Sequence, residues 1–141
     1  MLHGLIVTHG DLGRSLRATA ETMTGLGSDV DVLSNETHSR DSLCEAVEER
    51  LRIWGDEEGI VLTDIPGGSC THAALLRAAS HPNVGVVTGV NLPMLVDFLF
   101  NRGKYGVAEL AERLEFKGKA AVQNLHPVAH RSPPDEGRPT A

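Results

Sequence analysis

Leu5-Ile6-Val7-Thr8-His9-Gly10 opens the chain with a short apolar run that stops at a histidine and a glycine. The run shows no alternation of polar and apolar residues, which is typical of a strand buried on both faces, as in a parallel sheet. Similar runs follow at 60–62 and 84–87, and residues 30–33 form a weaker one that suits an edge strand. The sequence therefore predicts a parallel sheet, with His9 where its first strand ends.

Segments with helical periodicity lie between these runs. Their apolar stripes are Leu12, Leu16, Ala20 and Met23; Leu43, Val47, Leu51 and Trp54; Ala73 to Leu76; Leu95, Phe98 and Leu99; and Val107, Leu110, Ala111 and Leu114. Ser42 and Glu45 have the spacing of a capping box at the start of the second helix, and Asn91 can cap the fourth.

The alternation of strands and helices predicts an α/β fold, a three-layer sandwich with a mainly parallel sheet and helices on both faces. We infer the strand order 2-1-3-4, in which the first and third strands are neighbours. The short run Ala120-Ala121-Val122 is expected to form a last strand. Residues 1–125 are expected to form one domain, and residues 126–141, rich in proline and charge, a disordered tail.

Composition and charge exclude several classes of protein. A net charge of −6 over 141 residues argues against a nucleic-acid binder and against docking on anionic membrane. No signal peptide is evident, and no run approaches the length of a membrane span. The cysteines, Cys44 and Cys70, lack metal or redox spacing, so no metal site is predicted. We expect a cytoplasmic protein without stable membrane insertion.

Polar residues that follow the predicted strands would meet at one edge of the sheet. With the order 2-1-3-4, His9 and Asp64 face one crevice at the topological switch point. An aspartate that accepts a hydrogen bond from one ring nitrogen fixes the tautomer and frees the other nitrogen to attack. The stretch Gly67-Gly68-Ser69 precedes a helix, so its backbone N–H groups can hold an anion. The candidate residues are His9 and Asp64 for catalysis, and Gly10, Thr63, Gly67, Gly68 and Ser69 for phosphate binding.

Each feature also has a purely structural explanation. A histidine after a strand often caps a loop, and Asp64 can begin a turn with Pro66. Two residues beside this stretch are harder to interpret. Cys70 sits at a helix N-terminus, which lowers a thiol pKa, but no base is assigned to it and a passive role is expected. His72 either reaches the same rim or is simply exposed. The convergence of three features on one sheet edge favours a functional site.

The chain resembles the mannose-family IIA domain of the bacterial phosphotransferase system over residues 2–125. The resemblance rests on three blocks: Ile6-Val7-Thr8-His9-Gly10, Leu62-Thr63-Asp64-Ile65-Pro66-Gly67-Gly68-Ser69 and Val87-Thr88-Gly89-Val90-Asn91-Leu92-Pro93-Met94. It implies a phosphotransferase component without a dissociable cofactor. His9 would accept a phosphoryl group from the histidine phosphocarrier HPr and pass it to a IIB component. Asp64 would orient the imidazole, and Ser69 would contact the phosphate. It also implies a homodimer, with a C-terminal strand exchanged between its subunits.

Two departures from the family pattern leave the partner open. Pro66 stands where the family commonly has an aromatic residue, and Cys70-Thr71-His72 replaces the usual Pro-Phe-Asn. The alternative function is therefore a non-enzymatic signalling module whose phosphorylation state controls a regulator or kinase. A histidine phosphatase-like hydrolase is less favoured, because Thr8 stands where such enzymes place an arginine.

Overall fold

The computed structural model describes residues 1–126, in which four strands alternate with helices. The strands are β1 (His3–Thr8), β2 (Asp31–Ser34), β3 (Gly59–Thr63) and β4 (Val84–Val87), and the helices are α1 (Leu12–Thr24), α2 (Arg40–Trp54), α3 (Ser69–Ala78), α4 (Leu92–Asn101) and α5 (Val107–Ala120). The strands pair in parallel in the order β2-β1-β3-β4. The predicted fold class and strand order are confirmed.

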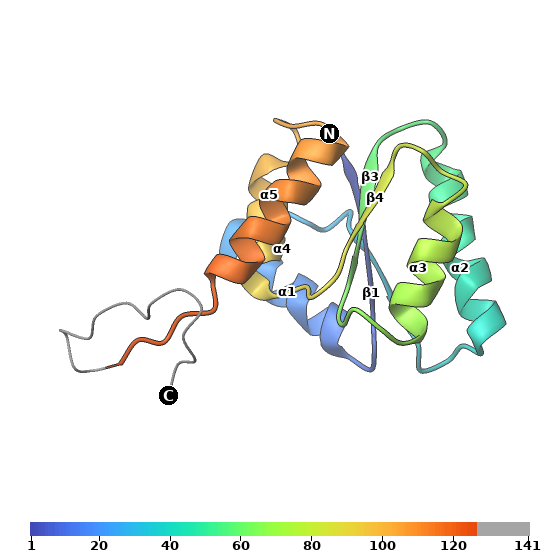
Figure 1. The fold of residues 1–141 in the computed structure, drawn as a ribbon, viewed down its shortest axis with the longest axis horizontal. Coiled ribbons are helices and arrows are strands. Elements are labelled where there is room, and N and C mark those ends of the chain that lie inside the picture. The colour runs from blue at the N-terminus through green and yellow to red at the C-terminus, as the bar shows by residue number, and fades with distance from the viewer. Residues whose placement is uncertain (127–141) are drawn as a thin grey trace, which may run out of the picture.

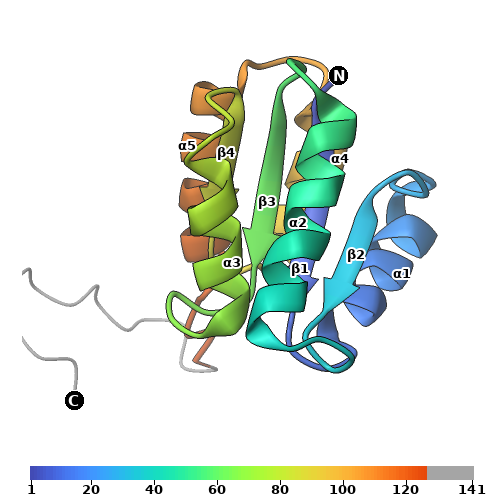
Figure 2. The same ribbon diagram turned by 90° about the vertical axis from the view of Figure 1, so that its right-hand side faces the viewer.

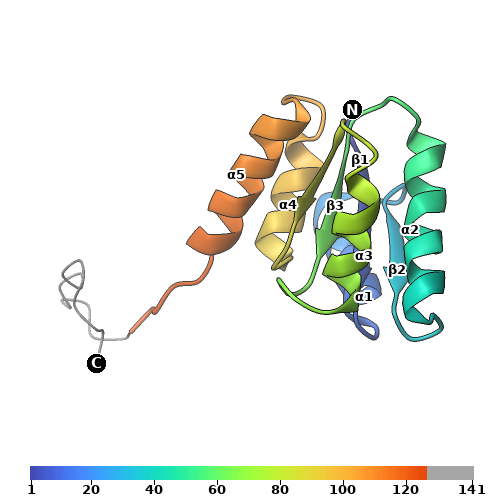
Figure 3. The same ribbon diagram turned by 45° about the vertical axis from the view of Figure 1, so that its right-hand side comes forward.

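Helices cover both faces of the sheet. α2 and α3 lie on one face, while α1, α4 and α5 lie on the other (Figure 1). Figure 2 looks onto the α2–α3 face, with the strands behind it in the order β4, β3, β1, β2. Figure 3 shows α4 and α5 side by side on the opposite face. The molecule is thus a three-layer sandwich.

Two apolar cores explain why the strands carry continuous apolar runs. Ile6 and Leu62 belong to the core under α1, α4 and α5, where Phe98 is fully buried. Leu5 and Val7 belong to the second core, under α2 and α3. Successive residues of a strand point to opposite faces, so a strand covered on both faces has no polar side.

The buried face of α1 and the first residue of α2 differ from the prediction. Leu12 and Met23 of α1 are exposed, and Ala20 is the buried member of that stripe, because α1 covers the edge of the sheet beside β2. α2 is capped by Ser39, whose side-chain oxygen accepts a hydrogen bond from the Ser42 N–H at 3.1 Å. The capping box expected at Ser42 is therefore wrong by one turn, since Ser42 already lies inside the helix.

The strand predicted at 120–122 is also wrong, because Ala120 is the last residue of α5. The buried stripe of α5 runs through Leu110, Leu114 and Gly118. A Cβ on Gly118 would lie only 2.6 Å from Cε of Met94, so this glycine is where α5 packs closely on α4. Residues 121–126 form no strand. The remainder of the expected tail, residues 127–141, lies outside the described residues.

Asn91 joins α4 to α5, as well as capping α4 as predicted. Its Oδ1 accepts a hydrogen bond from the Met94 N–H at 3.0 Å, and its Nδ2 donates to the Gly118 carbonyl at 3.0 Å. Among residues 1–126, no helix combines the length and apolar character needed to cross a membrane.

Candidate functional site

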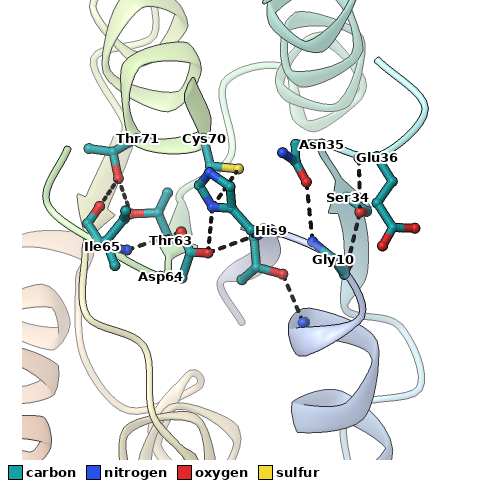
Figure 4. Close-up of polar contacts among 12 residues, drawn as sticks. His9, Gly10, Ser34, Asn35, Glu36, Thr63, Asp64, Ile65, Cys70 and Thr71 are labelled. Atoms are coloured by element: carbon teal, nitrogen blue, oxygen red, sulfur yellow. Dashed lines mark hydrogen bonds and ion pairs between the residues drawn. The ribbon is translucent and has the colours of Figure 1, made fainter. Parts of the chain in front are cut away.

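His9 and Asp64 meet because β1 and β3 are neighbours whose carboxyl ends lie at the same sheet edge. Val7 and Thr63 form the last β1–β3 pair, so His9 and Asp64, which follow them in the chain, emerge just beyond this pair. The ring Nδ1 of His9 lies 2.7 Å from Oδ2 of Asp64, and the same oxygen accepts the backbone N–H of His9 at 2.8 Å (Figure 4). The other carboxylate oxygen accepts the Ile65 N–H at 3.0 Å. Both oxygens of Asp64 are therefore fixed.

The environment of this pair sets its protonation. The side chain of Asp64 is 8% exposed and that of His9 is 41% exposed. Burial alone would raise the pKa of the Asp64 carboxyl, but the hydrogen bonds from the N–H and ring of His9 hold it below its usual value. An ionised carboxylate only accepts hydrogen bonds, so Nδ1 of His9 carries the proton that it donates. In the neutral ring, Nε2 then keeps its lone pair.

Gly68 lies against the Nε2 side of the ring. Its φ of 90° and ψ of 179° belong to a region that is essentially reserved for glycine. A Cβ at this position would lie 3.5 Å from Cε1 and 3.7 Å from Nε2 of His9. Ser69 follows as the first residue of α3, whose first N–H groups have no acceptor within the helix. The start of α3 therefore offers anion-binding donors beside Nε2.

This geometry predicts different effects for the two neighbouring glycines. Gly68→Ala should lower the free energy of unfolding by about 1–3 kcal/mol through backbone strain, and should slow any reaction at Nε2. Gly67→Ala is the matched control, because Gly67 has no positive φ and its Cβ would meet no atom within 4 Å. Urea denaturation of the two variants measures the difference; equal stabilities would contradict the assigned backbone conformation.

Two predicted phosphate ligands have other contacts. The Gly10 N–H donates to Oδ1 of Asn35 at 3.1 Å, and the Ser34 hydroxyl donates to the Gly10 carbonyl at 2.8 Å. The Thr63 side chain is fully buried, and its hydroxyl oxygen accepts from that of Thr71 at 2.7 Å. We therefore expect Gly10 and Thr63 to support the loops beside His9 rather than to contact phosphate.

Ser34 and Asn35 are contributors that sequence reasoning missed. They lie where β2 ends, and β2 pairs with β1, so they reach the turn that follows His9 (Figure 4). The Asn35 N–H also donates to the Thr8 carbonyl at 3.2 Å. The sequence feature that could have indicated their role is their position as two polar residues after the run at 30–33, the weakest of the predicted strands.

Cys70 lies beside the His9 ring, with its Sγ 3.7 Å from Nδ1. Burial, together with the charge of Asp64, raises the pKa of its thiol to about 11. The lowering expected at a helix N-terminus is therefore wrong, because loss of solvation outweighs it. Cys70 and Thr71 are buried, whereas Pro66 and His72 are exposed, so only these two of the family departures lie on the surface.

His9, Asp64 and Cys70 together form a group that sequence spacing did not reveal. One potential ligand atom from each lies within 4.8 Å of the others. His9 follows β1, whereas Asp64 and Cys70 lie more than fifty residues further along the chain, after β3 and in the first turn of α3, so no local motif contains all three.

Comparison with known proteins gives a consistent picture. The family profile described as "PTS system fructose IIA component" matches residues 4–115. The sorbose-specific EIIA component of the PTS system from Klebsiella pneumoniae is 23% identical over 115 residues, which cover 82% of this chain and 85% of that protein.

Solved structures share the fold. The mannose/sorbose-specific IIA subunit of the phosphotransferase system from Enterococcus faecalis superposes with a TM-score of 0.82 at 22% identity, covering 92% of this chain and 98% of its own. A PTS IIA protein associated with the fucose utilization operon of Streptococcus pneumoniae has a TM-score of 0.74 at 26% identity, covering 87% and 92% of the two chains. Because the family profile matches more than half of the chain, the protein belongs to the EIIA-man family of phosphotransferase-system IIA components.

Proposed function

We propose that the protein is a phosphocarrier that accepts a phosphoryl group on Nε2 of His9 from phosphorylated HPr and passes it to a IIB component. The observation that carries this proposal is the 2.7 Å contact between Nδ1 of His9 and Asp64, because it leaves Nε2 as the free nucleophile. Family membership supports the coarser assignment to the phosphotransferase system. We also propose that the protein acts in the cytoplasm.

The transfer needs positioning and charge stabilisation rather than further covalent chemistry. The lone pair of Nε2 forms the new P–N bond while the P–N bond to the donor histidine breaks, and the donor ring takes back that electron pair. The proton stays on Nδ1, and the Asp64 carboxylate that accepts its hydrogen bond balances the positive charge that the ring gains. The N–H groups at the start of α3 and the Ser69 hydroxyl hold the phosphoryl oxygens.

The test is phosphoryl flow through purified components. With phosphoenolpyruvate, the general phosphotransferase enzyme and HPr, the chain should gain one acid-labile phosphoryl group, measured by intact mass. Addition of a mannose-family IIB protein should then remove it. No uptake from HPr would contradict the phosphocarrier role.

The exposed departures at Pro66 and His72 favour a second candidate for the output of this chemistry. Pro66 lies on the loop before α3 and His72 in the first turn of α3, and these segments flank His9, where an acceptor must approach. A chain that is labelled by HPr but keeps its label with IIB proteins would be better explained as a regulatory module. In that case its phosphorylated and unphosphorylated forms should differ in affinity for a regulator or kinase.

We also propose that the protein is a homodimer, as the resemblance implies, and that β4 contributes to the contact. Among residues 1–126, β4 pairs only with β3, so its outer edge has unpaired backbone groups. A cavity of about 580 Å³ adjoins this edge; its lining includes Val86, Met94, Ala111 and Val122. A strand from a second copy would satisfy the edge of β4 and cover these apolar side chains.

A further inference from the structure

We propose that His9, Asp64 and Cys70 form a binding site for a thiophilic divalent cation such as Zn²⁺, and that an ion at this site prevents His9 from accepting a phosphoryl group. Each residue offers one ligand atom, and these atoms lie within 4.8 Å of one another; Nδ1 of His9 is 2.7 Å from Oδ2 of Asp64 and 3.7 Å from Sγ of Cys70. Nothing in the phosphocarrier chemistry requires a thiol at this position. The inhibitory part of the proposal rests on the proposed function, whereas the binding part does not.

The distances suit a tetrahedral ion. Zinc with a Zn–S bond of about 2.3 Å and a Zn–N bond of about 2.0 Å places these two ligand atoms about 3.5 Å apart. The observed separation of Sγ and Nδ1 is 3.7 Å. Oδ2 lies 2.7 Å from Nδ1, and this distance would have to increase by roughly 0.6 Å for both atoms to bind the ion. Three protein ligands leave the fourth position to solvent.

The set of donors selects the class of ion. One sulfur, one imidazole nitrogen and one carboxylate oxygen favour Zn²⁺ and similar borderline metals, whereas Mg²⁺ and Ca²⁺ prefer oxygen alone. Cys70 is fully buried and Asp64 nearly so, but the His9 side chain is 41% exposed. An ion therefore enters from the His9 side. The second Asp64 oxygen is held by the Ile65 N–H, which orients the carboxylate as outer contacts of metal ligands commonly do.

Metal binding and phosphoryl acceptance need opposite tautomers of His9. An ion on Nδ1 uses the lone pair of that nitrogen, so the single proton of the neutral ring moves to Nε2. The thiol proton of Cys70 leaves to solvent as its sulfur binds the ion. With a proton on Nε2 and no lone pair there, the ring cannot attack phosphorus. An ion also displaces the hydrogen bond between Nδ1 and Asp64 that orients the ring.

Cobalt absorption tests the site without any phosphoryl transfer. Titration of the full chain with Co²⁺ should produce a thiolate-to-cobalt charge-transfer band, and Zn²⁺ should remove it by displacement. Cys44→Ser should keep the band, because Cys44 lies on α2 outside this cluster. Cys70→Ser and Cys70→Ala should both lose it while keeping the wild-type far-ultraviolet circular dichroism. Absence of the band in the wild type, or its persistence in a folded Cys70 variant, would overturn the proposal.

Phosphoryl uptake tests the inhibition. One equivalent of Zn²⁺ should slow uptake from HPr by on the order of 10²-fold or more, as expected for a histidine held in the wrong tautomer, and a chelator should restore it. Each variant is compared with its own zinc-free rate. Cys70→Ala should lose this sensitivity and Cys44→Ser should keep it; equal inhibition of both would place the zinc effect elsewhere. If the zinc-free wild type takes up no phosphoryl group, the proposed function fails, while the cobalt spectrum still decides the site.

Discussion

His9→Gln should reduce phosphoryl incorporation from HPr to background. Glutamine keeps a polar side chain of similar length but offers no nitrogen lone pair that can form a P–N bond. The His9 side chain is 41% exposed, so the domain should remain folded. Quantitative intact-mass measurement after incubation with the donor proteins reads the result, and circular dichroism confirms the fold.

The control for this variant is His72→Gln. His72 is exposed in the first turn of α3, so it shares the start of that helix with the proposed phosphate-binding residues. The contact with Asp64 is made by Nδ1 of His9 and not by His72, and we therefore expect His72→Gln to be labelled like the wild type. A phosphoryl label that persists in His9→Gln and is lost in His72→Gln would show that His72, and not His9, is the acceptor.

Asp64→Asn should slow phosphoryl uptake by about 10²–10⁴-fold, the second-largest effect that we expect. The pKa of Asp64 is held below its usual value, so the wild-type residue is a carboxylate at neutral pH. The amide removes that charge. An amide that turns its NH₂ group toward Nδ1 also selects the tautomer with a proton on Nε2. Rapid-quench measurement of the transfer from HPr gives the rate.

Asp11→Asn is the matched control for the loss of a carboxylate near the site. Asp11 lies two residues after His9 but is exposed and pairs with Arg14. The same substitution there removes one negative charge from the rim without touching the imidazole. Equal rate losses in the two variants would mean that Asp64 acts through the overall charge of the rim and not by orienting the His9 ring.

The outline of the site could be predicted from the sequence because it depends on strand order. Continuous apolar runs imply a doubly covered parallel sheet, and in such a sheet the carboxyl ends of neighbouring strands bring His9 and Asp64 together. The register then places His9 and Asp64 side by side, since Val7 and Thr63 form the last β1–β3 pair in the ladder. The proximity of His9 and Asp64 therefore follows from strand order and register, without knowledge of any side-chain packing.

What escaped prediction depends on close packing, which periodicity does not record. Gly118 carries no apolar side chain, yet it continues the buried stripe of α5 because Met94 fills the space beside it. Cys70 is chemically unusual because of burial and a neighbouring charge rather than its place at a helix end. Asn35 is reached only across the β1–β2 pair. Each of these contacts joins segments whose spacing in the sequence has no fixed pattern.

The shared oxygen of Asp64 has a consequence for the thermodynamics of repeated transfer. Because Oδ2 accepts both the backbone N–H and the ring Nδ1 of His9, this residue is held to the end of β3 at two points, one on its backbone and one on its ring. The conformational entropy that this ring would otherwise retain is therefore lost once, when the chain folds, and not again in each encounter with a donor or acceptor. A relay protein that must both take up and release the same group benefits equally in the two directions, since a rigid nucleophile lowers both barriers without favouring either end state.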